Sequence, residues 1–432
     1  MDTASLDQWL ARLETLHPNP IDLGLERVAS VALALDLLPV AVPVVTVAGT
    51  NGKGSTVAVL EAILGGVGKR TGVYTSPHLL RFNERIRVGG VDASDAEIIA
   101  AFRDVDDARG DTSLTYFEFA TLAALLVFRT RAVDVLVLEV GLGGRLDAVN
   151  IVDPTVAVIT RIDLDHQAWL GSGRGSIARE KAGILRRGVP AVLGDPEPPP
   201  ELIESAAASG SQPVLRLGSE FGFESQGDHW QGSLRGPNGL RVLPPLPAGP
   251  LKPANICTGL QAALLLGCEM SDAQVIAAVA RARPRGRCER LSICGRDYVL
   301  DVAHNPAATY NLVEYLNVTP CKGKILALFS VMADKDIRGM ITAAAGCFDA
   351  WFVADQPANP RAARGEDVAA LLRAEGAAAI SVSKNLRQAL RRAQGVMAAG
   401  DRLVVFGSFH TVAEVLPLLD EEPGEMGRES RT

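Results

Sequence analysis

Residues 47–56 read VAGTNGKGST and lie between an apolar run at 44–48 and a helical run at 55–64. Glycines leave backbone N–H groups open to a ligand, and the first turn of a helix carries the positive end of its dipole. Lys53 adds a point charge to the same turn. The stretch therefore predicts a phosphate-binding turn that connects a buried strand to a helix.

The spacing of this turn differs from that of an ordinary P-loop. In the pattern G-x-x-x-x-G-K-[ST] the first glycine would fall on Val47, and Gly54 stands where a hydroxyl residue is expected. The alternative interpretation is a glycine-rich turn with an exposed lysine that binds nothing. The strand–turn–helix context favours nucleotide binding, whereas the spacing disfavours a GTPase.

Length and composition predict a two-domain globular protein. The chain has 432 residues, which is more than one hydrophobic core usually organises. Hydrophobic residues make up 47% and charged residues 22%, and the net charge of −7 argues against a nucleic-acid partner. The six cysteines form no C-x-x-C pair, which favours free thiols over a structural zinc site.

The sequence carries no signal for a membrane or for export. The N-terminal residues lack a basic region followed by an apolar core. The most apolar stretch, 31–48, is interrupted by Asp36, Pro39 and Pro43. We therefore expect a cytoplasmic protein without a membrane partner.

Short apolar runs alternate with longer helical segments, which is typical of buried parallel sheets. The predicted strands are 44–48, 133–140, 155–160, 190–193, 297–303, 324–330, 350–354, 379–383 and 402–406, and the later helices are 365–375 and 385–398. Residues 200–250 predict irregular loops or a small antiparallel excursion. The pattern occurs on both sides of a basic segment, 281–290, where we place the domain hinge, and we expect residues 421–432 to be frayed.

The turn GTNGKGS resembles the nucleotide loop of the Mur ligase superfamily, ATP-dependent enzymes that join a carboxylate to the amine of an amino acid. Within it, the chain is most similar to the dihydrofolate synthase/folylpolyglutamate synthase family, especially its bifunctional bacterial members. The motifs that carry this resemblance follow the family's order over nearly the whole chain: IDLGLERV (21–28), TVAGTNGKGS (46–55), YTSPHL (74–79), LTYFEF (114–119), LEVGLGGRLDAVN (138–150), DHQAWLG (165–171), REKAGI (179–184), PRGRCE (284–289), LDVAHNP (300–306) and FGSFH (406–410).

The resemblance implies an α/β fold with an N-terminal P-loop-type parallel-sheet ATPase domain and a C-terminal Rossmann-like domain. Residues 1–285 would form the ATP-binding domain with the pterin site, 286–296 a linker, and 297–432 a glutamate-ligase domain. By the same resemblance, the expected ATP contacts are Thr50, Asn51, Gly52, Lys53, Asn255, Arg287 and Asp301.

Glu139 ends a strand-like run at the edge where parallel sheets place ligands, and a carboxylate there suits Mg²⁺. His166 follows another such run and is either a hydrogen-bonded histidine or a ligand. The resemblance implies a magnesium site made by Ser76, Glu139 and His166. Ordinary P-loop logic would instead assign the metal hydroxyl to Ser55 or Thr56, and two magnesium ions would accommodate both; we favour Ser76.

The segment LTYFEF places two aromatic residues beside a carboxylate, which fits either a half-buried core element or the site of a flat heterocycle. Gly141–Gly144 alone would pass for a dinucleotide loop, but no helical run or later acidic residue completes that motif. The resemblance implies that dihydropteroate is bound by Asp22, Leu23, Gly24, Leu25, Thr115, Tyr116, Phe117, Glu118, Leu146, Asp147 and Ala148.

The resemblance also implies three catalytic residues: Lys53, Lys181 and His304. Lys181 would react with carbon dioxide to form a carbamate, a role that nothing in the composition indicates. His304 and Ser408 are the candidates for binding the incoming glutamate.

The implied reaction is ATP-dependent ligation of L-glutamate to dihydropteroate, giving dihydrofolate, and to reduced folates as γ-linked polyglutamate. It would pass through an acyl phosphate, and we expect a monomer. Two alternatives stay open from sequence: a monofunctional folylpolyglutamate synthase, and a nucleotide-binding regulator without catalysis.

Overall fold

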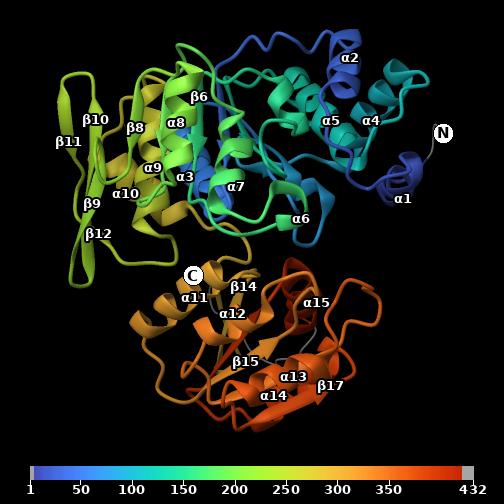
Figure 1. Ribbon diagram of the computed structural model, residues 1–432, viewed down its shortest axis with the longest axis vertical. Coiled ribbons are helices and arrows are strands. Elements are labelled where there is room, and N and C mark those ends of the chain that lie inside the picture. Colours follow the sequence, from blue (N-terminus) through green and yellow to red (C-terminus); the bar gives the residue numbers. More distant parts are fainter. Residues whose placement is uncertain (1–3, 421–432) are drawn as a thin grey trace. The chain divides into compact units, whose positions relative to one another are not determined.

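The computed structural model describes residues 4–420, so the expected frayed tail at 421–432 lies outside the described residues. The chain divides into two compact units, one ending at Ala282 and the other beginning at Arg283. Figure 1 shows the first unit in blue to yellow and the second in orange to red. Each unit is described by itself.

Unit 1 is organised by a sheet with the strand order β4-β3-β2-β5-β1-β6-β7-β8. Its strands are β1 (Val44–Ala48), β2 (Thr71–Tyr74), β3 (Ile86–Val88), β4 (Val91–Asp92), β5 (Val135–Glu139), β6 (Val156–Ile159), β7 (Ala191–Leu193) and β8 (Val214–Arg216). All neighbours pair in parallel except those of β3 and β4. Because β1 lies between β5 and β6, the glycine turn leaves from the middle of the sheet.

Helices cover both faces of this sheet. They are α1 (Leu6–Leu16), α2 (Glu26–Ala34), α3 (Lys53–Gly66), α4 (Asp95–Arg109), α5 (Tyr116–Thr130), α6 (Gln167–Leu170), α7 (Arg174–Ala182), α8 (Pro200–Ser209), α9 (Pro253–Leu265) and α10 (Asp272–Arg281), with 3₁₀ turns η1 (Phe82–Arg85) and η2 (Ala148–Ile151). Along β1, Val45 and Val47 join the core with α3, α9 and α10, whereas Val44 and Ala48 join the opposite core with α2, α4 and α5. This alternation is the period of a strand that is buried on both faces.

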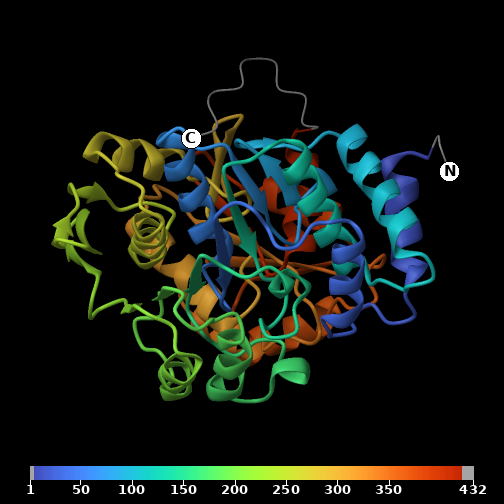
Figure 2. The ribbon, with the colours of Figure 1, turned by 90° about the horizontal axis from the view of Figure 1, so that it is seen from above.

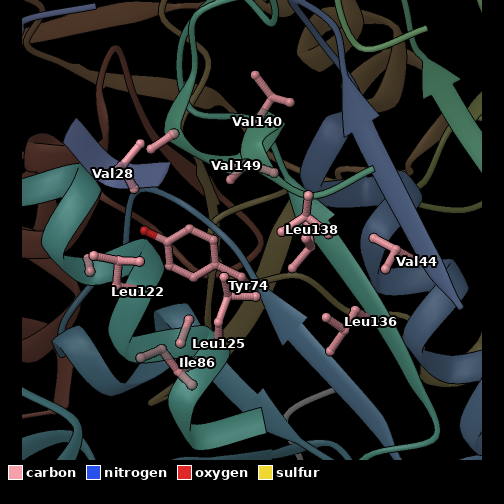
Figure 3. Close-up of a cluster of buried hydrophobic side chains, with 14 of the residues drawn as sticks. Val28, Val44, Tyr74, Ile86, Leu122, Leu125, Leu136, Leu138, Val140 and Val149 are labelled. Carbon is pink, nitrogen blue, oxygen red and sulfur yellow. The ribbon is translucent and has the colours of Figure 1, made fainter. Parts of the chain in front are cut away.

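The core under α2 and α5 surrounds one aromatic ring. Figure 3 shows the Tyr74 ring of β2 among Val28, Leu122 and Leu138, which come from α2, α5 and β5. Tyr74 is fully buried, and burial raises the pKa of its hydroxyl. The ring therefore serves as packing, and it anchors the segment of α5 that carries the LTYFEF motif.

Residues 200–250 form more structure than the sequence predicted. They include the expected antiparallel excursion, made of β9 (Gly222–Gln226), β10 (His229–Gly236), β11 (Gly239–Val242) and β12 (Leu246–Pro247). In Figures 1 and 2 these strands lie at the end of unit 1 opposite α1 and α4. Before them, however, α8 begins with Pro200 at a favourable first position, and β8 extends the parallel sheet beside β7.

Unit 2 has the strand order β13-β14-β18-β15-β16-β17. Its elements are β13 (Glu289–Ile293), β14 (Arg296–Asp301), α11 (Pro306–Val318), β15 (Ile325–Phe329), α12 (Ile337–Ala343), β16 (Ala350–Ala354), α13 (Gly365–Ala374), β17 (Ile380–Ser383), α14 (Leu386–Val396), β18 (Arg402–Phe406) and α15 (Phe409–Asp420). The strands from β14 to β18 pair in parallel, as the apolar runs predicted. Both units are therefore α/β.

The expected linker, residues 286–296, contains the strand β13. This strand pairs antiparallel with β14 and places Ile293 opposite Arg296. Cys294 and Gly295, the two residues between them, have φ values of 50° and 72°, the left-handed geometry of a tight two-residue hairpin. The hairpin signal was missed because cysteine is an unusual residue at the first of these positions.

Among residues 4–420, no helix is both long enough and apolar enough to cross a membrane.

Candidate active site

The glycine turn is held by the segment that follows β6. Thr50 donates its N–H to the carbonyl oxygen of Arg161 (2.8 Å), its hydroxyl donates to the carbonyl of Asp163 (3.0 Å), and the Asp163 N–H donates back to that hydroxyl (3.0 Å). Gly49, with φ of 150°, packs so closely on Thr160 that a Cβ would overlap the threonine hydroxyl. The turn is thus fixed before any ligand binds.

Gly52 brings the side chain of Asn255 to the start of α3. Its φ of 98° is left-handed, and a Cβ added at this position would overlap the Asn255 amide oxygen. Asn255 lies in the first turn of α9. The structure therefore gathers five expected ATP residues in unit 1: Thr50, Asn51, Gly52, Lys53 and Asn255.

Two lysines share one acceptor in this turn. Lys53 Nζ donates to the carbonyl oxygens of Gly49 (3.0 Å) and Thr50 (3.4 Å), and Lys181 Nζ donates to the same Gly49 carbonyl (2.9 Å). Lys181 lies in the last turn of α7 and is only 5% exposed. Its burial, and next the positive charge of Lys53, lower the pKa of Lys181 to about 7 against the pull of Asp165 and Asp147.

Glu139 and Ser76, two of the expected metal ligands, are in contact. Glu139 is the last residue of β5, is 5% exposed, and its Oε2 accepts a long hydrogen bond from the Ser76 N–H (3.4 Å). A Cβ at Gly54 would lie 4.0 Å from both carboxylate oxygens, so the carboxylate faces the start of α3. These oxygen donors beside a helix N-terminus fit Mg²⁺, a hard cation that keeps several waters.

The third expected ligand, His166, is exposed at the start of α6. It has a left-handed backbone (φ 50°), and its Nε2 lies 3.8 Å from Asp165 Oδ2. Within residues 4–420, no group of three or more His, Cys, Asp and Glu side chains is arranged to hold a metal ion. The expected ligands Ser76, Glu139 and His166 include one glutamate and one histidine. A site made by them would therefore not count as a group of three such side chains.

The expected pterin segments converge on the first turn of α5. Thr115 caps this helix by accepting the Glu118 N–H, and Glu118 Oε2 accepts the Thr115 N–H (2.7 Å) and hydroxyl (2.9 Å). The Phe117 ring lies 5.8 Å from that of Tyr74, and a Cβ at Gly141 would be 2.7 Å from Phe117 Cζ. The helix start and the glycine-rich turn after β5 therefore pack directly on each other.

Asp147 lies at the end of the glycine-rich turn that follows β5. Its carboxylate caps η2 by accepting the Val149 N–H (3.0 Å), and it also accepts the Leu142 N–H (2.8 Å). Full burial raises the pKa of Asp147 to about 6, although these N–H donors and Lys181 oppose the shift.

Arg27 and Arg85 are residues that sequence reasoning missed. Arg27 ties Asp22 to Glu118. Arg85 lies 5.6 Å from the ring of Phe82 and 5.5 Å from that of Tyr116, and it donates to His78 Nδ1 (2.8 Å). Arg27 belongs to the IDLGLERV motif, but neither arginine was among the expected site residues, because a sequence does not show against which segments a guanidinium packs.

In unit 2, Arg287 and His304 lie near the ring of Phe409, and Asp301 is close enough to Arg287 to feel its charge. Buried Asp301 ends β14 and accepts the N–H groups of Cys288 (2.8 Å) and Ala303 (2.7 Å); burial raises its pKa, which Arg287 opposes. The Arg287 guanidinium lies 5.5 Å from the Phe409 ring centre. The His304 ring lies 6.3 Å from the same ring, and its Nδ1 contacts the Val302 carbonyl (2.9 Å).

Ser408 is placed differently from these three. Its buried hydroxyl accepts the Thr411 N–H (3.0 Å) at the start of α15 and lies 2.8 Å from the Thr411 hydroxyl. The serine thus caps a helix, which is a structural use of the side chain expected to bind glutamate.

Two family profiles match the chain. The Mur ligase middle domain matches residues 47–220, and the Mur ligase glutamate ligase domain matches residues 286–409.

Several relatives cover most of the chain. The dihydrofolate synthase/folylpolyglutamate synthase of Escherichia coli (strain K12) is 43% identical over 96% of this chain and 96% of its own length. The protein of the same name from Mycobacterium tuberculosis is 31% identical over 98% of this chain and 95% of its own length. A protein named only folylpolyglutamate synthase, from Lacticaseibacillus casei, is 32% identical over 73% of this chain and 77% of its own length.

Solved structures give the same picture. Escherichia coli FolC in complex with DHPP and ADP has a TM-score of 0.91 at 41% identity and covers 97% of this chain and 98% of that chain. The Yersinia pestis bifunctional enzyme complexed with AMPPNP and Mn ion has a TM-score of 0.88 at 43% identity, with coverage of 97% and 98%. A bifunctional enzyme with Mn, AMPPNP and L-glutamate bound has a TM-score of 0.88 at 42% identity, with coverage of 97% and 98%.

The contact between Gly52 and Asn255 leads to a prediction for Gly52→Ala. The new Cβ would displace Asn255 and distort the turn, so we expect ADP to bind at least about tenfold more weakly, which corresponds to about 1.4 kcal/mol. Calorimetric titration with ADP measures this change.

Gly68→Ala is the matched control, because Gly68 also has a left-handed backbone (φ 85°) but open space around its Cβ position. Both variants should lose about 1–2 kcal/mol of folding free energy from the strained backbone. Equal nucleotide affinity in the two variants would contradict the role of the close approach.

Proposed function

This chain belongs to the dihydrofolate synthase/folylpolyglutamate synthase family of Mur ligases, and from that premise we propose how its own residues perform the reaction. The protein is an ATP-dependent ligase that joins L-glutamate to dihydropteroate and to folates. The relative named only folylpolyglutamate synthase is less similar than the bifunctional Escherichia coli one, and a non-catalytic regulator finds no support. The observation that carries the proposal is the pair of lysine ammonium groups on the Gly49 carbonyl.

ATP is held at the glycine turn by Thr50, Asn51, Gly52 and Lys53. The turn offers backbone N–H groups and a helix start, and Lys53 supplies a mobile charge for the β- and γ-phosphates. Asn255 supports the turn from α9. Arg287 and Asp301 stay the other proposed ATP residues, as the family resemblance implies. ADP and AMPPNP in the similar structures support this proposal.

Ser76, Glu139 and His166 are the proposed ligands of one magnesium ion. The buried Glu139 carboxylate supplies the negative charge, and the contact with Ser76 places a hydroxyl residue beside it. When bound, the ion would neutralise charge on the transferring phosphate oxygens. Mn in similar structures supports a divalent cation, and Ser55 or Thr56 would serve a second ion.

The reaction proceeds in two steps. First, a carboxylate oxygen of dihydropteroate or folate attacks the γ-phosphorus, forming an acyl phosphate while the bond to ADP breaks. Lys53 and the N–H groups of the turn stabilise the charge that spreads over the transferring oxygens. Second, the amine of L-glutamate attacks the acyl carbon, phosphate leaves with the bonding electron pair, and the new amide nitrogen loses a proton.

The substrates are assigned to separate segments. The pterin is held by Asp22–Leu25, Thr115–Glu118 and Leu146–Ala148. The second segment lies near Tyr74 and packs on Gly141, in the turn that leads to the third. Residues 1–285 would thus carry ATP and pterin, and 297–432 the glutamate, with His304 and Ser408 as its contacts. We further propose that the protein acts as a monomer in the cytoplasm.

Lys181 is the proposed site of a carbamate. With its pKa lowered to about 7, roughly half of the amine is neutral at pH 7 and able to attack carbon dioxide. The neutral nitrogen forms a bond to carbon and releases one proton, which gives an anionic carbamate. Counted from the ammonium form, the side chain loses two protons and changes from a cation to an anion. That change would turn the repulsion between Lys181 and Lys53 into attraction, which favours the modified state.

Phosphate release by the purified protein tests the ligation. With ATP, Mg²⁺, dihydropteroate and L-glutamate, we expect release only when all four are present, because the acyl phosphate waits for the amine. Lys53→Ala should lower the rate at least about a hundredfold, since it removes the charge at the transferring phosphate. Lys69→Ala, which removes an exposed lysine three residues beyond α3, is the control. Phosphate release that does not require glutamate would refute amide ligation.

Carbon-13 NMR in labelled bicarbonate tests the carbamate. Because the folded-state pKa of Lys181 is lowered to about 7, the neutral amine and hence the carbamate signal should rise as pH increases from about 6 to 8. Lys181→Ala should lack the signal and Lys69→Ala should keep it. If the protein without substitutions gives no carbamate signal at pH 8, the proposed carbamate at Lys181 is refuted.

Phe117→Leu tests the pterin segment. Phe117 is half-buried beside Gly141, so we expect the KM for dihydropteroate to rise about tenfold while the KM for ATP stays unchanged. Phe119→Leu is the matched control, because Phe119 is fully buried against Phe102 in the same helix. Equal effects of the two variants on dihydropteroate would place the pterin elsewhere.

A further inference from the structure

One arginine joins two of the proposed pterin segments. Arg27 Nη1 donates to Asp22 Oδ2 (2.9 Å), while its Nη2 donates to the Asp22 carbonyl (2.9 Å) and to Glu118 Oε1 (3.1 Å). Asp22 begins the loop Asp22–Leu25, and Glu118 lies in the first turn of α5. We call Asp22, Arg27 and Glu118 the arginine clasp.

The loop has few other polar ties to the fold. Between α1 and α2, residues 18–24 take part in no backbone–backbone hydrogen bond with any described residue. The other polar contacts come from His17, whose Nδ1 contacts Asn19 and whose Nε2 lies 3.4 Å from Asp22 Oδ2. The position of the loop relative to α5 therefore depends strongly on Arg27.

The other end of the clasp is buried. Glu118 is 3% exposed, and its two oxygens have separate partners: Oε2 accepts from Thr115, and Oε1 accepts from Arg27. One carboxylate thus caps α5 and holds the cation that holds the loop. Figure 3 shows the neighbouring core, in which Val28, the residue after Arg27, and Leu122 of α5 belong to one buried cluster around Tyr74.

The chemistry of the clasp calls for arginine. Three hydrogen bonds in different directions need the planar fork of a guanidinium, whereas a lysine ammonium is a point charge on a flexible stem. Arg27 Nε is also buried and has no hydrogen-bond partner in the described structure, so the hydrogen bonds of this guanidinium run through Nη1 and Nη2. The geometry is that of a residue selected for placing two segments relative to each other.

We propose that Arg27 is a positioning residue for the pterin substrate: the arginine clasp holds Asp22–Leu25 against the first turn of α5, so that both segments bind the heterocycle together. The inference rests on the pterin site proposed above. It adds a residue that acts through Asp22 and Glu118, and it predicts an effect on the pterin substrate alone. Nucleotide binding at the glycine turn should be independent of it.

Steady-state kinetics of Arg27→Gln test the proposal. We expect the KM for dihydropteroate to rise about tenfold, with the KM for ATP unchanged and kcat at saturation within about threefold of the original value. Arg27→Lys should keep the charge but restore little of the affinity, because it cannot make all three bonds.

Arg12→Gln is the matched control. The Arg12 side chain is 27% exposed against 29% for Arg27, and it makes a two-bond pair with Asp106 that links α1 to α4 away from the pterin segments. Both variants should lower the melting temperature to a similar extent. Only the Arg27 variant should raise the KM for dihydropteroate. If both variants raise this KM equally, the arginine clasp only stabilises the fold and does not position the pterin loop.

Glu118→Gln provides a second route if Arg27→Gln does not fold. Glutamine serves as well as glutamate in the capping box, so α5 keeps its cap while the ion pair to Arg27 is lost. The KM for dihydropteroate should again rise, and the double variant should lose less than the sum of the two single losses, because both substitutions remove the same hydrogen bond. Unchanged dihydropteroate KM in folded Arg27→Gln or in Glu118→Gln would overturn the proposal.

The Phe117→Leu result separates this failure from failure of the pterin site. If Phe117→Leu weakens dihydropteroate binding and the clasp variants do not, the site stands and the clasp is refuted. If none of them affects dihydropteroate, the pterin site itself is misplaced, and the clasp is refuted with it.

Discussion

Lys53 and Lys181 donate to the same carbonyl oxygen, that of Gly49, and the rest of the site is arranged around this contact. The oxygen is held in place because Gly49 packs against Thr160 without room for a side chain, and because Thr50 is tied to the loop after β6. Two positive charges in a buried turn repel each other, so the turn favours any group that brings negative charge. A phosphate and a carbamate both do so, and each would relieve the same repulsion.

The fold was predictable where buried strands are long enough to be read as apolar runs. Val44–Ala48 and Arg402–Phe406 are buried along their whole length, and both were predicted. The failures are short or lie at an edge. β8 has three residues, and β13 is only partly buried and depends on a left-handed turn at Cys294 and Gly295. Such edges are fixed by pairing with a neighbour, which a local pattern does not contain.

The site was predictable in part, for a related reason. The glycine turn could be interpreted from its own residues, because a strand, three glycines and a lysine are adjacent in the chain. The lowered pKa of Lys181 could not be predicted from the sequence, because it arises from burial at the end of α7 and from the charge of Lys53. The resemblance supplied the residue, and its burial beside Lys53 supplies a physical argument for the proposed carbamate. Ser408 is the converse case, since its hydroxyl is already used by the first turn of α15.

The arginine clasp has a consequence for inheritance. Glu118 is buried and serves two partners. A mutation at position 27 therefore leaves two carboxylates without their shared cation, and a mutation at position 22 or 118 removes one of the two carboxylates that hold the arginine. A lineage that altered one of them would gain from altering the others, and sequences that descend from a common ancestor should show the three positions changing as a set. Recombination that exchanged the segment before the glycine turn alone would separate Arg27 from its carboxylate on α5, and such hybrids should be rare among functional descendants.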